Sequence, residues 1–175
     1  DGMVSNMGAV TGIAAGTGSH FVVVLSGLVI IAVESISMAV GSYLSSKSEQ
    51  EIDERKLNEE RFELKTYPQE ERDELTEMYV KDGWPPVLAK EMATAASQNK
   101  DLFLQEMAYR ELKIIPNNGN HPFHNGLAMG IAYIAGGAVP LVPYFIIGSP
   151  LAAIPVSVAV TLIGLFALGA YTTKF

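Results

Sequence analysis

Apolar and charged residues occupy separate stretches of this chain, and the change from one to the other falls inside a single helical pattern. Residues 21–40 are apolar apart from Glu34 and a few small polar residues, which is enough to cross a hydrocarbon core of about 30 Å as a helix. From Lys47 the chain is densely charged and helix-forming, and neither Gly nor Pro occurs before Pro68. The pattern predicts one helix that begins as a membrane span over 21–45 and continues unbroken past Lys56.

Three further apolar runs, over 3–17, 123–147 and 151–172, predict additional spans. The first carries glycines every fourth residue (Gly8, Gly12 and Gly16). That spacing lets another helix approach closely within a bilayer, so we expect a homodimer. A glycine-rich loop is the alternative interpretation of this run.

Breaker residues divide the charged segment into short helices. Residues 47–65 extend the second span, and further helices are expected from Pro68 to Gly83, from Trp84 to about Asn99, and from Asp101 to Ile114. Residues 116–122 form the linker back to the membrane. The predicted fold class is an all-α membrane protein, a transmembrane helix bundle with a helical insert. The domains are spans one and two (1–46), the insert (47–115), and spans three and four (116–175).

Charge supports this division. Of 19 acidic residues 17 lie in the insert, together with 11 of the 12 basic residues, so the insert has a net charge of 11 − 17 = −6. An acidic balance excludes nucleic acid as the expected partner and favours cations. The absence of cysteine excludes disulfides and thiolate metal sites. Counting of positive residues places the insert in the cytoplasm. We expect the chain to be truncated at both ends.

Two pairs of glutamates with a spacing of three residues lie on either side of Pro68. They are Glu60 with Glu63 and Glu71 with Glu74. A spacing of three places both carboxylates of a pair on one helix face, and converging carboxylates suit Mn2+, Fe2+ or Ca2+. In so acidic a segment, spacing alone favours the simpler interpretation of a solvated charged face.

Met107 and Glu111 are four residues apart on the last predicted helix of the insert. A thioether beside a carboxylate would suit Fe2+, although methionine at helical spacing more often packs in a core.

Within the bilayer, Glu34 and Met38 share a face of span two, and Asp1 precedes span one. Ionisable residues at membrane depth usually have a function, so Glu34 is expected to line an ion or proton path. The histidines lie at span ends and are interpreted as interfacial, although His121 and His124 leave a weak metal option.

Several segments in this order resemble the vacuolar iron transporter family. They are residues 1–5 (DGMVS), 34–44 (ESISMAVGSYL), an acidic helical insert, and 137–144 (GAVPLVPY). The resemblance implies five spans, one of which would follow Phe175, a dimer, and export of Fe2+, often also Mn2+, from the cytosol in exchange for protons. It implies no organic cofactor.

The resemblance also implies roles for individual residues, and it reverses the interpretation drawn from spacing alone. The implied metal ligands of the insert are Glu60, Glu63, Glu71, Glu74, Met107 and Glu111. The implied transport path uses Asp1 and Met38. This chain departs from the family pattern at Ile30 and Ser42, where many members carry acids, and Glu34 is expected to substitute from one turn away.

The function expected from these observations is a divalent metal transporter, not an enzyme, that moves Fe2+ and/or Mn2+ out of the cytosol by proton exchange. It would lie in a bacterial inner membrane, or in a vacuole-type membrane if eukaryotic. One alternative is a membrane-tethered carboxylate module that oxidises or stores iron. Modules of that kind use Glu-x-x-His pairs, and the insert contains no histidine. A membrane scaffold with an acidic interaction domain is a third possibility, which leaves Glu34 unexplained.

Overall fold

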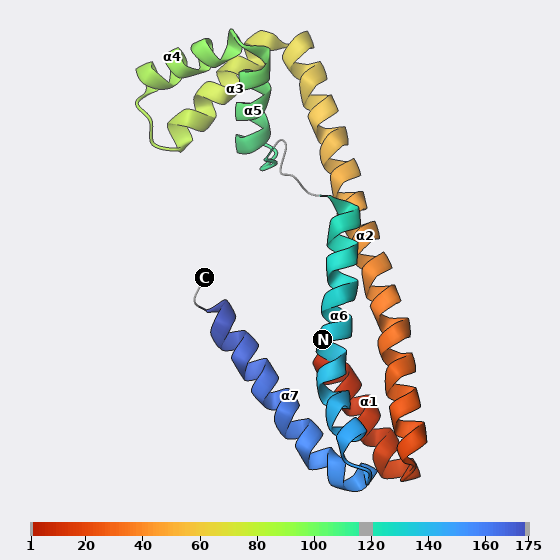
Figure 1. Cartoon of the computed structure of the whole chain (residues 1–175). Helices are drawn as coiled ribbons and strands as arrows, with labels where there is room; N and C mark the ends of the chain where they lie inside the picture. Colours follow the sequence, from red (N-terminus) through yellow and green to blue (C-terminus); the bar gives the residue numbers. More distant parts are fainter. Residues whose placement is uncertain (1, 116–120, 174–175) are drawn as a thin grey trace. The chain divides into compact units, whose positions relative to one another are not determined.

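The computed structural model describes residues 2–115 and 121–173, and every regular element within those ranges is a helix (Figure 1). The helices are α1 (Gly2–Thr17), α2 (His20–Thr66), α3 (Pro68–Lys81), α4 (Pro86–Ser97), α5 (Lys100–Arg110), α6 (Pro122–Ile146) and α7 (Pro150–Thr172). The all-α fold class is confirmed. Asp1 and most of the expected linker, residues 116–120, lie outside the described residues.

Helix α2 confirms the central prediction, because its 47 residues run from the apolar segment into the charged segment without a break. Pairs one turn apart line its charged part, with Lys47 Nζ 3.9 Å from Glu51 Oε1 and Gln50 Nε2 donating to Glu54 Oε1 at 3.0 Å. Exposed pairs of this kind contribute only about 0.2–0.5 kcal/mol each. The continuity therefore depends mainly on the lack of Gly and Pro.

Three of the described helices, α2, α6 and α7, are long and apolar enough to cross a membrane. The start of α2 and both ends of α6 and α7 agree with the predicted spans to within one residue. Helix α1 is also a helix as predicted, but it has 16 residues, or about 24 Å at 1.5 Å per residue. That length is shorter than a hydrocarbon core of about 30 Å.

The chain forms two compact units. The apolar unit contains the residues up to Ser45 and those from Pro122 onward, and the insert unit contains Ser46–His121. In the apolar unit, α1, α6 and α7 pack against one another and α2 adds its apolar part. The buried core of this unit is formed by Val10, Ala14, Val23, Ile31, Leu141, Tyr144 and Ala153.

Glycines on α6 allow it to lie directly against α2. A Cβ atom added to Gly126 would come within 2.7 Å of the Ala39 carbonyl oxygen, and one added to Gly130 would come within 3.1 Å of the Ala39 Cβ. Gly137 continues the same face against Ile31. Such backbone contact between helices requires residues without side chains.

Polar side chains of the apolar unit bond to backbone carbonyls of α6. The buried Asn6 amide donates to the Gly137 carbonyl, and Ser157 Oγ donates to the Pro140 carbonyl at 2.6 Å. His20 Nε2 lies 2.6 Å from the carbonyl oxygen of Tyr144, in the last turn of α6. The last carbonyls of a helix lack intrahelical donors, so His20 acts as a cap.

In the insert unit, α3, α4 and α5 enclose a small core. It contains Leu75, Tyr79, Ala89, Ala93, Ala96, Phe103 and Met107. A polar cluster joins α3 to α5, because Tyr79 Oη donates to Glu106 at 3.0 Å and the Arg110 guanidinium lies 4.4 Å from the centre of the Tyr79 ring. Arg110 also pairs with Glu106 and Asp82.

The expected end of the last insert helix at Ile114 is wrong, since α5 ends at Arg110. Lys113 adopts a left-handed conformation with φ of 56°, which an α-helix cannot include. The chain thereby turns back, so that the Ile114 amide donates to the Ala108 carbonyl at 2.9 Å and the Ile114 side chain becomes buried. Burial of Ile114 and this backbone bond replace the last helical turn.

Gly126→Ala is expected to destabilise the apolar unit, because the added methyl group would meet the Ala39 carbonyl. Gly41→Ala is the matched control, since nothing lies within 4 Å of a Cβ there and alanine gains up to about 1 kcal/mol over glycine within a helix. Thermal unfolding in detergent checks the pair. Equal melting temperatures for the two variants would contradict the close α2–α6 contact.

Candidate metal centre

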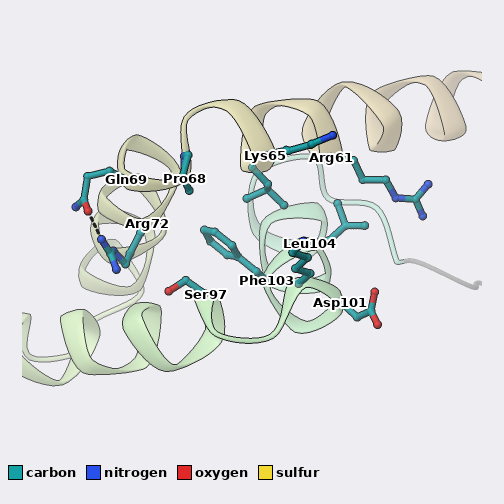
Figure 2. A pocket seen from close by; sticks show the side chains of 11 residues that line it. Arg61, Lys65, Pro68, Gln69, Arg72, Ser97, Asp101, Phe103 and Leu104 are labelled. Atoms are coloured by element: carbon teal, nitrogen blue, oxygen red, sulfur yellow. Dashed lines mark hydrogen bonds between the residues drawn. The ribbon is translucent and has the colours of Figure 1, made fainter.

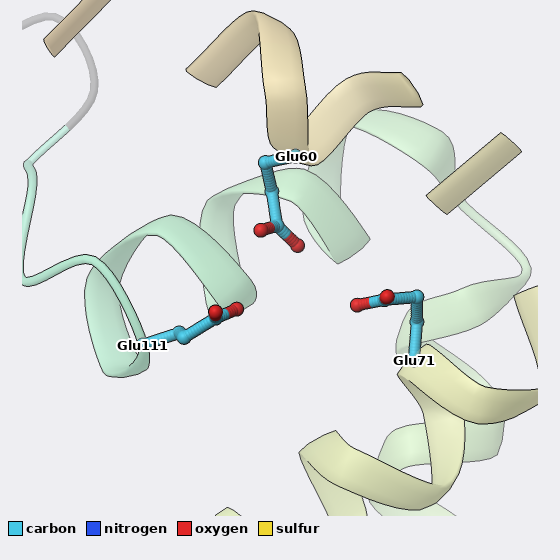
Figure 3. Close-up of side chains that lie close together, drawn as sticks. All are labelled: Glu60, Glu71 and Glu111. Atoms are coloured by element: carbon cyan, nitrogen blue, oxygen red, sulfur yellow. The ribbon is translucent and has the colours of Figure 1, made fainter. Parts of the chain in front are cut away.

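Three carboxylates from three different segments meet in the insert unit. Glu60 projects from α2, Glu71 from α3 and Glu111 from the residue after α5, and Figure 3 shows the three side chains pointing toward one another. One oxygen from each lies within 4.8 Å of the others. We call this set the carboxylate triad.

The local sequence explains how Glu60 and Glu71 meet. Helix α2 ends at Thr66 and α3 begins at Pro68, so a single residue, Tyr67, joins the two. Proline is well suited to the first helical position because its φ is preset and its missing N–H would have no partner there. Glu71 lies in the first turn of α3 and Glu60 lies near the end of α2, so the reversal brings both carboxylates to the same place.

Each triad residue lies one helical turn from an apolar residue of the insert core. Glu60 precedes Leu64 by four residues, Glu71 precedes Leu75, and Glu111 follows Met107. Leu75 and Met107 are fully buried, and Leu64 packs against the same core. Since residues four apart share a helix face, packing of the core fixes the directions of all three carboxylates.

Two of the three carboxylates are removed from water. Glu60 is 2% exposed and Glu71 is 8% exposed, whereas Glu111 lies at the surface. Among the described residues, Glu60 Oε1 is buried without a hydrogen-bond partner, and the ion pairs found there do not involve the triad. A buried carboxylate oxygen without a partner is costly, and a proton or a cation would relieve that cost.

The electrostatics agree with this geometry. Burial raises the pKa of Glu60 to about 8, and the charges of Glu111, Glu71 and Glu63 add to the rise. Burial also raises the pKa of Glu71 to about 7, with contributions from Glu74, Glu63 and Glu111. The pKa of Glu111 is raised as well, chiefly by desolvation. Near neutral pH the triad therefore retains protons that a binding cation would displace.

The donor set suits a divalent cation that prefers oxygen ligands. When the bonds from a cation to oxygen are about 2.0–2.6 Å long, two oxygens on opposite sides of the ion lie about 4–5 Å apart. The oxygens of the triad lie within 4.8 Å of one another, close enough for one ion to reach all three. Mg2+, Ca2+, Mn2+ and Fe2+ all accept carboxylate ligands, so the geometry defines a class of ion rather than one element.

The other ligands predicted from the resemblance lie around the triad or apart from it. Glu63 and Glu74 are exposed, and their charges raise the pKa of Glu71. Met107 is fully buried in the insert core, and its role as a ligand stays a prediction. His121 and His124 are exposed.

The membrane residues lie in the apolar unit. Glu34 and Met38 are half-buried on α2, as are Ile30 and Ser42, the two positions for which the sequence resemblance implies a departure from the family pattern. These four residues form a row with a four-residue spacing along one flank of the buried face. Asp1 lies outside the described residues. The proposed path therefore stays a prediction.

Sequence reasoning did not single out the burial of Glu60 and Glu71 or their direct approach to Glu111. One signal is the four-residue step from each acid to an apolar residue of the core. That step is not sufficient, because the exposed Glu74 also lies four residues before Met78, which packs against the same core.

The fold and this cluster are those of an all-α membrane protein whose charged insert brings together three carboxylates that could hold a divalent cation. The family model described as the VIT family matches residues 1–175, and the chain belongs to that family.

Relatives named as transporters match most of the chain. Vacuolar iron transporter 1 of Arabidopsis thaliana is 29% identical over 169 residues, which cover 97% of this chain and 68% of the relative. Vacuolar iron transporter 1 of Tulipa gesneriana is 28% identical, covering 100% of this chain and 71% of the relative. The vacuolar iron transporter of Acanthamoeba castellanii is 33% identical, over 80% of this chain and 52% of the relative. The family assignment makes the chain a membrane transporter rather than an enzyme.

Stability of the metal-free insert is expected to fall as pH rises. The pKa values of Glu60 and Glu71 are raised from 4.5 to about 8 and about 7. A raised folded-state pKa stabilises the fold below the unfolded pKa, and that stabilisation is lost as pH rises through the folded value. The window is therefore about pH 4.5 to 8. Denaturant unfolding followed by fluorescence of Trp84, the single tryptophan, measures this in the whole protein.

The matched variants for this measurement are Glu60→Gln and Glu59→Gln, one residue apart on α2. The first removes a buried titrating group and flattens the pH dependence, whereas the second alters an exposed group and leaves the dependence in place. Stability that increased with pH over this window would contradict the description of the triad.

Replacement of Glu60, Glu71 and Glu111 together by Gln is expected to abolish Mn2+ binding by the insert. Loss of an outer-shell partner alone costs about 10–100-fold in metal affinity, so loss of three anionic ligands should exceed about a hundredfold. The control is the exposed set Glu59, Glu77 and Glu91 changed to Gln, which has the same charge change. Calorimetric titration with Mn2+ that gave equal affinities for the two triple variants would identify the triad as a solvated face.

Proposed function

We propose that this protein transports Fe2+, and Mn2+ as a second substrate, out of the cytosol in exchange for protons. The observation that carries the proposal is the carboxylate triad, which offers three oxygen donors within 4.8 Å and includes a buried, unpartnered oxygen of Glu60. Membership of the VIT family and relatives named vacuolar iron transporters support iron as the substrate. Borderline Fe2+ and Mn2+ both accept carboxylate ligands.

In this proposal the insert faces the cytoplasm and collects the metal. Its net charge of −6 raises the local concentration of cations, and the triad binds one of them. Glu63 and Glu74 lie beside the triad, and Met107 would add a softer ligand if the core opened around it. The protons that the triad holds near neutral pH leave when metal binds.

The membrane path would use Glu34 and Met38 on α2, with Asp1 contributing from the preceding segment. A carboxylate at membrane depth usually has a function, and it can bind either a cation or a proton. Competition between the two at Glu34 would be the simplest physical route to metal–proton exchange. Met38, one turn away, would add a neutral ligand.

Two other functions fit these observations less well. An iron-oxidising or storage module of the di-iron type uses histidines beside its glutamates, and the insert has none. A scaffold with an acidic interaction surface would keep its carboxylates in water, whereas Glu60 is only 2% exposed.

We also propose a homodimer in the bilayer. Gly8, Gly12 and Gly16 form a row on α1, and nothing within the described chain lies within 4 Å of a Cβ added at any of them. This row leaves a backbone surface that a partner helix could approach closely.

Glu34→Gln is expected to abolish proton-coupled transport while metal binding by the insert persists, because the amide cannot carry the exchanged proton. Met38→Ala is expected to slow transport less, since a neutral ligand holds no proton. Fe2+ uptake and internal pH are measured together in proteoliposomes at several external pH values. Coupled exchange at the original rate in the Glu34→Gln protein would show that another group carries the proton.

Gly12→Leu is expected to weaken the dimer, since its side chain would separate the two backbones. Gly169→Leu is the control. It introduces the same side chain on α7, at a position where nothing lies within 4 Å of an added Cβ atom. Cross-linking in mild detergent distinguishes monomer from dimer. A native protein that cross-links only as a monomer would refute the dimer itself.

A further inference from the structure

A cavity of about 700 Å³ in the insert unit has a lining opposite in charge to the insert as a whole. Four cations line it, namely Arg61, Lys65, Arg72 and Lys100, against one acid, Asp101. The insert that contains it has 17 acids and 11 cations, so this lining is a strong local reversal. We call this site the cationic pocket.

The four cations lack carboxylate partners among the described residues. Arg61 donates to the side-chain oxygen of Asn58 at 3.1 Å and Arg72 donates to the Gln69 side chain, both neutral acceptors. The ion pairs found in the described chain involve other cations, Lys47 and Arg110. Four unpaired cations around one cavity repel one another, and an anion bound between them would remove that cost.

The floor of the pocket is apolar. The Phe103 side chain is 5% exposed, and Leu64, Pro68 and Leu104 complete the surface beside it. Figure 2 shows the Phe103 ring in the middle of the view, with Arg72 on the α3 side and Lys65 and Arg61 on the α2 side. A ligand for this site therefore combines negative charge with an apolar or planar part.

Helix α3 adds a second anion-binding feature. Pro68 and Gln69, its first two residues, line the pocket, and no side chain caps its N-terminus. The helix dipole at an N-terminus favours phosphate groups, but Pro68 has no N–H and Glu70 and Glu71 lie in the same first turn, so the pocket cations supply most of the attraction. Guanidinium groups such as those of Arg61 and Arg72 match phosphate oxygens in a two-point geometry.

We propose that the cationic pocket binds an organic phosphate, with the phosphate between the cations and the organic part against Phe103. The volume lies within the range of about 300–1,000 Å³ usual for small-molecule sites. The same chemistry occurs in a soluble nucleotide and in a phosphorylated lipid headgroup. The proposal goes beyond metal transport, because the pocket and the carboxylate triad have no residue in common.

The test is equilibrium binding of ATP to the whole protein in neutral detergent, with a soluble short-chain phosphatidylinositol phosphate as the second ligand. We expect saturable binding to one site per chain. Preference for ATP identifies a free organic phosphate as the ligand, and preference for the lipid identifies a headgroup. Absence of saturable binding of both ligands overturns the proposal.

Matched variants distinguish phosphate binding in the cationic pocket from a general attraction of the ligand to positive charge on the insert. Lys65→Gln with Lys100→Gln removes two pocket cations, and Arg55→Gln with Lys56→Gln removes two exposed cations elsewhere on α2. The first pair is expected to weaken binding by about tenfold or more, because charge-assisted hydrogen bonds are lost, whereas the second changes binding little. Equal losses in the two pairs would overturn the proposal.

Mn2+ titration of the same proteins supplies the second measurement. Retained Mn2+ affinity in Lys65→Gln/Lys100→Gln shows that the insert is folded, so a loss of phosphate binding then belongs to the pocket. Should Mn2+ binding also be lost, the single variants Lys65→Gln and Lys100→Gln replace the pair, and unchanged phosphate affinity in both overturns the proposal. Failure of proton-coupled transport would leave these phosphate results unaffected, because the experiment requires Mn2+ binding by the insert but no transport.

Discussion

The fold of the insert depends on a balance between two interactions. Packing of its small apolar core stabilises the fold, and the mutual repulsion of three carboxylates destabilises it. Two full negative charges about 5 Å apart repel by about 3 kcal/mol at an effective dielectric constant of 20. Burial of one leucine side chain contributes about 1.5–3 kcal/mol, so each such repulsion offsets about one buried core side chain, and neutralising part of the charge relieves that cost. Protons do this in the metal-free state, as the raised pKa of Glu60 indicates, and a divalent cation would do it more fully.

Helices α2 and α3 contribute residues both to the negatively charged carboxylate triad and to the positively charged cationic pocket. Glu60 is followed by Arg61, and Glu71 is followed by Arg72. Consecutive residues of a helix point about 100° apart, so each acid faces the triad while the next residue lines the cationic pocket. A helical segment that carries many charges of both signs can thus present its acids on one face and its cations on another, simply through the order of residues along the helix.

Much of the fold follows from the sequence. The missing breakers between Gly41 and Pro68 are sufficient to predict α2, and Pro68, Gly83 and Pro86 mark the turns of the insert. The early end of α5 was not predictable, because it depends on Ile114 folding back under Ala108 rather than on a local breaker. The glutamate pairs include two members of the carboxylate triad, but spacing alone could not tell which member of each pair is buried. Tertiary packing decides this, because Glu60 and Glu71 are buried while Glu63 and Glu74 remain exposed.

The row Ile30, Glu34, Met38 and Ser42 bears on the proposed exchange reaction. All four residues are half-buried on one flank of α2, and successive members are about 6 Å apart along the helix axis. The row contains a single carboxylate, Glu34. Under the proposed function, one carboxylate offers one place for an exchanged proton, whereas a divalent ion carries two charges. Balanced exchange through this row would therefore require a second acid, and Asp1 is the other acid that the sequence places beside a span.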